Sequence, residues 1–147
     1  MLSQRPGGGP SGPPVGKTAG MAALRQIVVD CARPWQLARF WAAALDGFGV
    51  RRYDDAEVAR LAALGLTPET DPAVIVDGPH IEICFQQVDL ARPAKTPVHL
   101  DIDSTNWHAE VERLVGLGAT VKEWFEDHTW MLDPEGNDFC LVNAATR

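Results

Sequence analysis

Residues suited to acid–base chemistry lie on one side of an alternating segment. Residues 98–103 read VHLDID, so apolar residues alternate with His99, Asp101 and Asp103. Successive side chains of a strand point to opposite faces, which places the imidazole and both carboxylates on one face. A histidine near a carboxylate is held in its charged form. Asp101 is therefore a candidate catalytic residue in a His/Asp acid–base pair, or an anchor for a cationic or hydroxyl-bearing ligand. The alternative is that Asp101 only bonds the backbone of a neighbouring loop.

Three other segments repeat this alternation, namely 26–30, 80–86 and 138–142. If the four strands belong to one sheet, their polar faces form a single polar concavity. The residues gathered on that common face would be Gln26, Glu82, His99 and Cys140. Cys84 shares the predicted face of Glu82 and is a further candidate for binding a ligand. An antiparallel sheet with its second face in water shows the same pattern without any site, and is the alternative.

The first twenty residues differ in composition from the rest of the chain. The tract MLSQRPGGGPSGPPVGKTAG is rich in Gly and Pro and has no acidic residue, which predicts a disordered leader over 1–20. It lacks the apolar core of a signal peptide. Met21 directly precedes the first strand-like run, and one hypothesis is that translation starts there. Residues 21–147 then suit a single domain.

The remainder of the chain is acidic. Without Arg5 and Lys17 of the leader it has 11 basic and 20 acidic side chains, a formal charge of −9. This charge argues against a nucleic-acid partner. No apolar run reaches the ~18 residues of a membrane span, so we expect no membrane association. Three cysteines without an export signal fit reduced thiols, which predicts a cytoplasmic protein.

The expected elements occur in the same order in the two halves of the chain. Pro34 starts an amphipathic helix that ends near Gly47, and a second such helix ends before Gly118. Each helix follows an alternating strand and precedes about three further strands. Asp54 starts a short helix between the halves, and 66–72 is predicted to be a loop. The fold class is therefore α+β, with two tandem βαβββ modules over about 23–90 and 96–144.

One turn and its surroundings suggest a family. The sequence DPEGN at 133–137 runs into an acidic residue and then Phe-Cys, while a Phe40-Trp41 pair lies on the first helix and His99 opens the second half. Together with the duplicated order, these features resemble the vicinal oxygen chelate superfamily, which includes glyoxalases, bleomycin- and fosfomycin-resistance proteins and extradiol dioxygenases. The likeness is strongest to small glyoxalase-like domain proteins. It implies a curved mixed sheet around a cavity.

The resemblance also implies a set of metal positions. Metal-dependent members place one ligand on the first and last strand of each half, and the corresponding residues here are Gln26, Glu82, His99 and Cys140. The implied cofactor is a divalent metal, zinc or nickel. Cys140 departs from the usual glutamate, which in glyoxalases binds metal and also moves the substrate proton. A thiolate can bind zinc but is a poor base of that kind. Asp138, on the same face, is the available candidate for a catalytic base.

These residues favour some activities over others. An extradiol dioxygenase needs two histidines and a carboxylate on iron, and Gln26 removes one histidine, which argues against that activity. The leading hypothesis is a glyoxalase-like protein that binds a small organic molecule in a polar cavity, with lyase or isomerase chemistry. His99 and Trp130 are the candidate ligand-binding residues. The alternative is a non-catalytic protein that sequesters a small molecule, as bleomycin-resistance proteins do. We also expect a homodimer.

Overall fold

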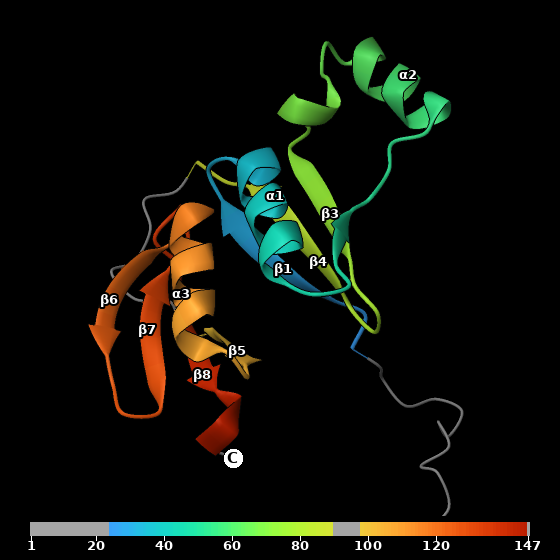
Figure 1. Ribbon diagram of the computed structural model, residues 1–147. Helices are drawn as coiled ribbons and strands as arrows, with labels where there is room; N and C mark the ends of the chain where they lie inside the picture. Colours follow the sequence, from blue (N-terminus) through green and yellow to red (C-terminus); the bar gives the residue numbers. More distant parts are fainter. Residues whose placement is uncertain (1–23, 90–97, 147) are drawn as a thin grey trace, which may run out of the picture.

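The computed structural model describes residues 24–89 and 98–146, and its elements fall into two modules of the same order (Figure 1). The expected leader and Met21 lie outside the described residues. The elements of the first module are β1 (Gln26–Cys31), α1 (Pro34–Ala44), β2 (Gly49–Val50), α2 (Asp55–Ala63), the 3₁₀ turn η1 (Pro68–Thr70), β3 (Ala73–Asp77) and β4 (Glu82–Gln87). Those of the second are β5 (Leu100–Ser104), α3 (Trp107–Gly116), β6 (Thr120–Trp124), β7 (His128–Leu132), β8 (Asp138–Asn143) and η2 (Ala144–Thr146).

The strands form two mixed four-stranded sheets of the same topology. Their orders are β1-β4-β3-β2 and β5-β8-β7-β6. The neighbours β1 and β4 are parallel, as are β5 and β8, and all other neighbouring strands are antiparallel. The predicted α+β fold of two βαβββ modules is thus confirmed. The polar faces are divided between two sheets, however, because no hydrogen-bonded strand pairing among the described residues joins the sheets. The expected single sheet across both modules is replaced by two.

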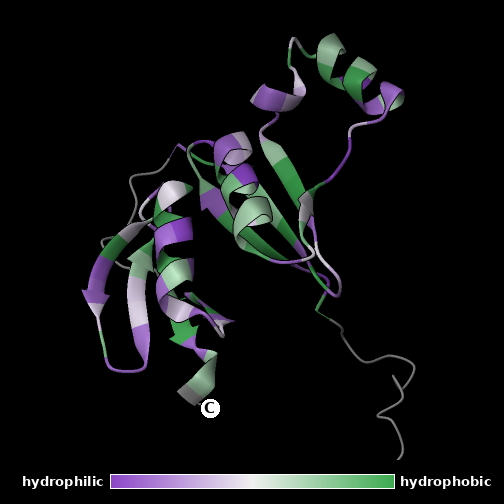
Figure 2. Cartoon of the chain, in the orientation of Figure 1, coloured by the Kyte–Doolittle hydropathy of each residue, from purple (hydrophilic) through white to green (hydrophobic). Residues whose placement is uncertain are grey.

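Helix α1 forms where the sequence predicts it, and packs on the first sheet. Pro34 occupies its first turn, where a missing N–H costs nothing. The helix ends at Ala44 rather than near Gly47, because Leu45 already has an extended backbone. Apart from Pro34, its buried residues belong to the same core cluster as Val74 and Phe85 of the sheet. The colouring in Figure 2 shows hydrophilic and hydrophobic residues on the same helix, as expected when only one face is buried.

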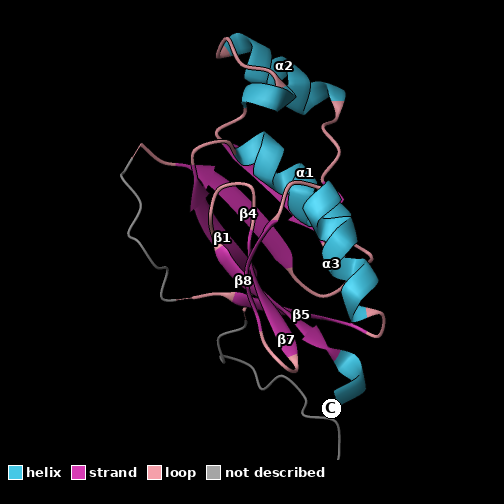
Figure 3. Cartoon of the chain, turned by 60° about the vertical axis from the view of Figure 1, so that its left-hand side comes forward, coloured by secondary structure: helices cyan, strands magenta, loops and turns pink. Residues whose placement is uncertain are grey.

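The segment between β2 and β3 carries a second, more exposed helix. The Asp54 carboxylate caps α2 by accepting a hydrogen bond from the Glu57 N–H at 2.8 Å. Leu61 is the buried residue of this helix. The predicted loop at 66–72 contains η1, which is stabilised by a hydrogen bond from the Thr67 N–H to Thr70 Oγ1 at 2.8 Å. Helix and turn lie beyond the end of the first sheet (Figures 1 and 3).

The turn at 133–137 holds the two modules together. Asp133 is 3% exposed, and its Oδ2 accepts hydrogen bonds from Trp41 Nε1 of α1 at 3.1 Å and from Asn137 Nδ2 at 2.6 Å. Its Oδ1 accepts the N–H groups of Glu135 and Asn137. Gly136 has a φ of +80°, which other residues adopt only at a cost. The turn therefore fixes its own shape and anchors α1 with one buried carboxylate.

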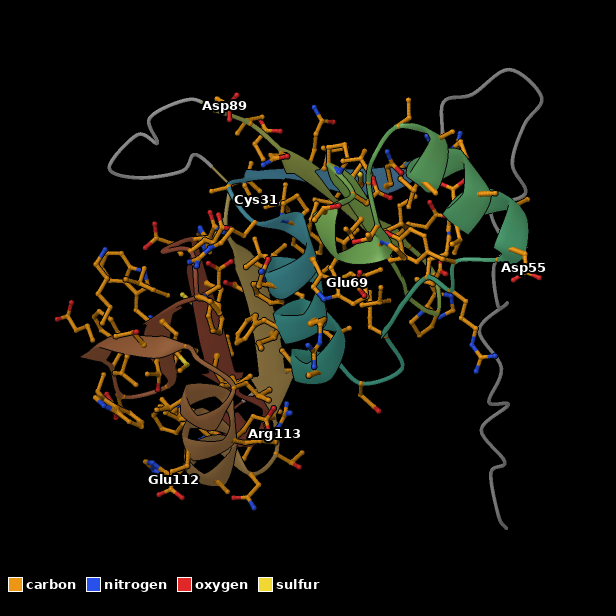
Figure 4. All side chains as sticks on the ribbon, turned by 90° about the horizontal axis from the view of Figure 1, so that it is seen from above. Cys31, Asp55, Glu69, Asp89, Glu112 and Arg113 are labelled. Atoms are coloured by element: carbon orange, nitrogen blue, oxygen red, sulfur yellow. The ribbon has the colours of Figure 1, made fainter. Side chains whose placement is uncertain are left out.

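Two further contacts complete the junction between the modules. The Glu135 carboxylate accepts the N–H groups of Ala32 and Arg33, directly before α1, at 2.8 and 2.6 Å. At the other end of α1, Arg113 of α3 donates to the carbonyls of Ala43 and Ala44, both at 2.8 Å. Figure 4 labels Arg113 at this contact and its neighbour Glu112. Both ends of α1 are thus held by the second module.

Aromatic packing extends the core across this junction. Phe139 of β8 lies edge-on to Trp41, with ring centroids 5.2 Å apart. Val111 and Leu114 of α3 belong to the same buried cluster. One hydrophobic core therefore runs through both modules. Among the described residues, every helix is too short or too polar to span a membrane.

We expect Asp133→Ala to lower the free energy of unfolding by about 3 kcal/mol. The substitution removes the acceptor of the buried Trp41 indole and the hydrogen bond from the Asn137 side chain, and hydrogen bonds to charged groups contribute about 1.5–3 kcal/mol each. Chemical denaturation followed by tryptophan fluorescence measures the change. Glu112→Ala, which removes an exposed carboxylate from the middle of α3, is the control and should change stability by less than about 0.5 kcal/mol. Equal stability of the two variants would contradict this account of the junction.

Candidate functional site

The chemically capable residues of the second module meet on the sheet face opposite its core. Leu100 and Ile102 of β5 pack against the core cluster, so Asp101 between them points to the other face. In the strand register Asp101 lies opposite Cys140 of β8, and Cys140 lies opposite Trp130 of β7. Three neighbouring strands thus supply one polar surface, as the alternation predicted for this half of the chain.

His99, Asp101 and Cys140 form the group on this face that could hold a metal ion. Their donor atoms, one from each residue, all lie within 4.8 Å of one another. His99 Nε2 is 3.3 Å from Asp101 Oδ1, and both side chains are 52% exposed. Such an exposed pair contributes little to stability, because water and salt screen it. The cluster is therefore open to ligands and costs the fold little to maintain.

The Cys140 thiol is biased toward its neutral form. Partial burial raises its pKa, and the nearby carboxylates of Asp101 and Asp138 raise it further. Both effects disfavour the thiolate, since the first removes water and the second adds like charge. Without a cation at the site, Cys140 is thus a poor nucleophile at neutral pH. A divalent cation between the same groups would reverse that bias.

Asp138 lies beside the cluster and is held by two neighbours. It is 9% exposed, and its Oδ1 accepts a hydrogen bond from Trp130 Nε1 at 2.7 Å. The ammonium group of Lys122 is 3.4 Å from the same oxygen and 3.7 Å from the centroid of the Trp130 ring. Lys122 therefore covers one face of the Trp130 ring, a candidate ligand-binding residue. Sequence reasoning missed Lys122. Its position in the strand predicted at 120–126 was the available signal that it could lie next to Trp130.

The first-module candidates lie on the other sheet. Gln26 of β1 lies opposite Glu82 of β4 in the strand register, as expected if the two residues share one face of the sheet. Glu82 Oε1 accepts a hydrogen bond from Arg51 Nη2 at 2.6 Å, while Oε2 is buried without a hydrogen-bond partner among the described residues. Arg51 also pairs with Asp77. Sequence reasoning missed Arg51, which follows the two-residue strand β2 and carries no motif.

Cys84 lies on the same sheet face as Glu82 and is 7% exposed. Burial raises the pKa of its thiol, with smaller contributions from Asp71 and Glu82. It is thus a neutral, largely enclosed group. The four expected metal positions are divided between the sheets, with Gln26 and Glu82 on the first and His99 and Cys140 on the second. Asp101 supplies the carboxylate next to His99 and Cys140 that was expected from Glu82.

The His99 cluster fits a zinc-type metal by the chemistry of its donors. Imidazole nitrogen, thiolate sulfur and carboxylate oxygen are the three ligand types that zinc uses in proteins. Three protein donors also leave a position for water or substrate. The pair on the first sheet fits less well, since Glu82 already shares one oxygen with Arg51. Among the described residues, the second module thus offers the donor set that fits a metal.

Comparison with known proteins gives the fold a context. A family model described as "Glyoxalase-like domain" matches residues 26–142. A glyoxalase/bleomycin resistance protein/dioxygenase family enzyme from Burkholderia phytofirmans has a similar structure, with a TM-score of 0.59 and 15% identity over 82% of this chain and 97% of that chain. A glyoxalase family protein from Bacillus cereus gives a TM-score of 0.54 and 14% identity over 85% and 97% of the two chains. No curated protein matches the sequence. At such identities the structural likeness concerns the fold alone.

We predict that Asp101→Asn accelerates alkylation of Cys140 by iodoacetamide at pH 8, by roughly threefold. Removing the carboxylate charge lowers the thiol pKa and so raises the thiolate fraction at that pH. Mass spectrometry of the peptide that contains Cys140 measures the rate. Asp103→Asn is the matched control, because Asp103 lies on the same strand face but does not contribute to the shift at Cys140. An equal acceleration by both substitutions would show that Asp101 has no specific influence.

Proposed function

The chain belongs to the glyoxalase-like domain family, and we propose that it binds a small organic molecule at the polar site on the second module. The observation that carries the proposal is the convergence of His99, Asp101 and Cys140 within 4.8 Å, next to Trp130 and Asp138. Three donor types on one open face suit a polar ligand or a metal-bound one. The three cysteines form no disulfide in the part of the chain that the structure describes, which supports a reducing compartment, the cytoplasm, as the place where it acts.

In the enzymatic form of the proposal, the chain is a lyase or isomerase. His99, Asp101 and Cys140 hold a divalent metal, zinc by preference and nickel otherwise, which when bound polarises a substrate oxygen. Asp138 acts as the base. Its Oδ1 is held by Trp130 and Lys122, while among the described residues its Oδ2 has no hydrogen bond and is left to accept or return a proton. Trp130, fixed through this bond, orients the ligand.

The second candidate is a sequestering protein with no catalysis. Cys140 stands where glyoxalases usually have a glutamate, and its raised pKa keeps the thiol protonated at neutral pH, so little thiolate is present to accept a proton or attack a substrate. Glu82 is engaged with Arg51. These two observations favour a site that recognises a molecule without transforming it. In that case His99 and Asp101 bind polar groups of the ligand directly.

The proposal includes a homodimer. The residues expected to complete a four-ligand site, Gln26 and Glu82, lie on a different sheet from His99 and Cys140. A second copy can bring the first-module face of one chain to the second-module face of the other. Strands β1 and β5 are sheet edges among the described residues, and Val28 of β1 is 48% exposed. Sheet edges that pair with no further described strand, together with exposed apolar side chains, favour such pairing.

Zinc titration of metal-stripped protein tests whether His99, Asp101 and Cys140 hold a metal. We expect one zinc per chain, with affinity that rises between pH 6 and 8 because the Cys140 thiol, whose pKa is raised, must lose its proton on binding. His99→Ala should weaken binding by at least the roughly 10–100-fold that loss of an outer-shell partner costs. Asp103→Asn is the control and should bind normally. Protein that takes up no zinc at micromolar concentrations, yet gains thermal stability with members of a metabolite library, would favour sequestration.

Light scattering coupled to size exclusion tests the dimer. We expect a mass of twice the 16.0 kDa of one chain at micromolar concentrations. Val28→Lys places a charge on the exposed edge of β1 and should shift the mass toward one chain. The matched control is Val115→Lys, on the exposed surface of α3, which should leave the mass unchanged. A 16 kDa species for the unmodified chain throughout the range would contradict the dimer.

A further inference from the structure

The first module contains a pocket that shares no residue with the His99 cluster. Its volume is about 560 Å³, within the roughly 300–1,000 Å³ of typical small-molecule sites. It is formed by the segment that leads from β2 into α2, by α2 itself and by β3. Figure 1 shows this helix and its flanking loops beyond the end of β3. The pocket thus lies between β3 and the segment with α2, which has no counterpart in the second module.

The base of the pocket is apolar. Ala73 and Ile75 of β3 line it, while the alternate residues Val74 and Val76 are fully buried on the other face of the sheet. Ala73 and Ile75 therefore point away from α1 and toward the pocket. Ala56 of α2 adds a further small side chain to the lining. This surface can receive the hydrocarbon part of an organic ligand.

Three arginines line the pocket, and two of them are already neutralised. Arg51 pairs with Asp77 and Glu82, and Arg60 pairs with Glu57 one turn earlier on α2. Arg52 is exposed and has neither an ion pair nor a hydrogen bond within the ranges 24–89 and 98–146. It is therefore the pocket cation that can bind an anionic ligand. Its planar guanidinium matches a carboxylate with two parallel hydrogen bonds.

The inner wall is negative and rigid. Asp71 is 6% exposed, and its two oxygens accept hydrogen bonds from the Tyr53 hydroxyl at 3.1 Å and the Ala73 N–H at 3.0 Å. Burial raises the pKa of Tyr53, and the Asp71 charge raises it further, so the hydroxyl keeps its proton. Asp54 and Glu57 also line the pocket. With Glu57 paired to Arg60, the carboxylates of Asp71 and Asp54 remain to disfavour a ligand with several negative charges, such as a phosphate ester.

We infer that this pocket binds a small monocarboxylate with an apolar body, whose carboxylate pairs with Arg52 and whose hydrocarbon part lies on Ala73 and Ile75. The cavity size, the apolar base, the single uncommitted cation and the carboxylates around it all select this class. The inference does not depend on the proposed function of the second module. The two sites can be tested separately.

The test is an NMR titration of the full, ¹⁵N-labelled chain with 3-phenylpropanoate and with its neutral analogue 3-phenylpropanamide. We expect the carboxylate to shift the amide signals of residues 51–57 and 71–75. The amide should bind about tenfold more weakly, because it lacks the charge that strengthens the hydrogen bonds to Arg52. Arg52→Gln should weaken binding of the carboxylate by a similar factor and leave that of the amide unchanged. Ala56→Trp, which fills the pocket, should abolish the shifts for both.

Arg39→Gln is the matched control, since Arg39 is exposed on α1 and does not line the pocket. It should bind 3-phenylpropanoate as the unmodified chain does. Three results would overturn the inference: no shifts in either segment, equal affinity for acid and amide, or equal losses in the Arg39 and Arg52 variants. Shifts at residues 99–101 and 138–140 in place of the pocket would also overturn it, and would support binding at the second-module site. Zinc uptake in Arg52→Gln reports on the proposed function independently.

Discussion

The architecture of this protein depends on one buried carboxylate. Asp133 is enclosed and receives hydrogen bonds from two side chains and two backbone N–H groups, so its charge is stabilised by neutral donors. One of those donors is the indole of Trp41, which belongs to the other module. The turn therefore links the position of α1 to the start of β8. Because β8 carries Asp138 and Cys140, the same interaction that joins the modules also sets where the polar site begins.

The two sheets use their charges differently. On the first sheet, Arg51 pairs with Asp77 and Glu82. Glu82, which occupies one of the expected metal positions, is therefore held in an ion pair. On the second, Asp101 and Asp138 outnumber Lys122, and the thiol of Cys140 is kept protonated beside them. A surplus of negative charge around a neutral thiol and an imidazole favours a divalent cation over an anion. The physical difference between the sheets thus lies in where the positive charge is placed.

The segment between β2 and β3 distinguishes the modules more than any other part. It introduces α2 and η1, which have no counterpart between β6 and β7, where the chain turns directly. This added segment brings the buried Asp71, its partner Tyr53 and three arginines to the open face of the first sheet. A duplicated scaffold can thereby hold two chemically different surfaces, one where His99, Asp101 and Cys140 converge and one where Arg52 faces a pocket with an apolar base.

Local patterns in the sequence determined most of the fold. Alternation placed the core and open faces of β1, β4, β5 and β8 correctly, and Pro34 marked the start of α1, because such signals depend only on residues near one another in the chain. The neighbourhood of His99, Asp101 and Cys140 followed from the same alternation once β5 and β8 paired. The division into two sheets, the role of Asp133 as the link to Trp41, and the positions of Arg51, Lys122 and Arg52 were decided by tertiary structure alone. Long side chains reach several ångströms from their backbone, and their partners are selected by packing between distant segments, which no local pattern records.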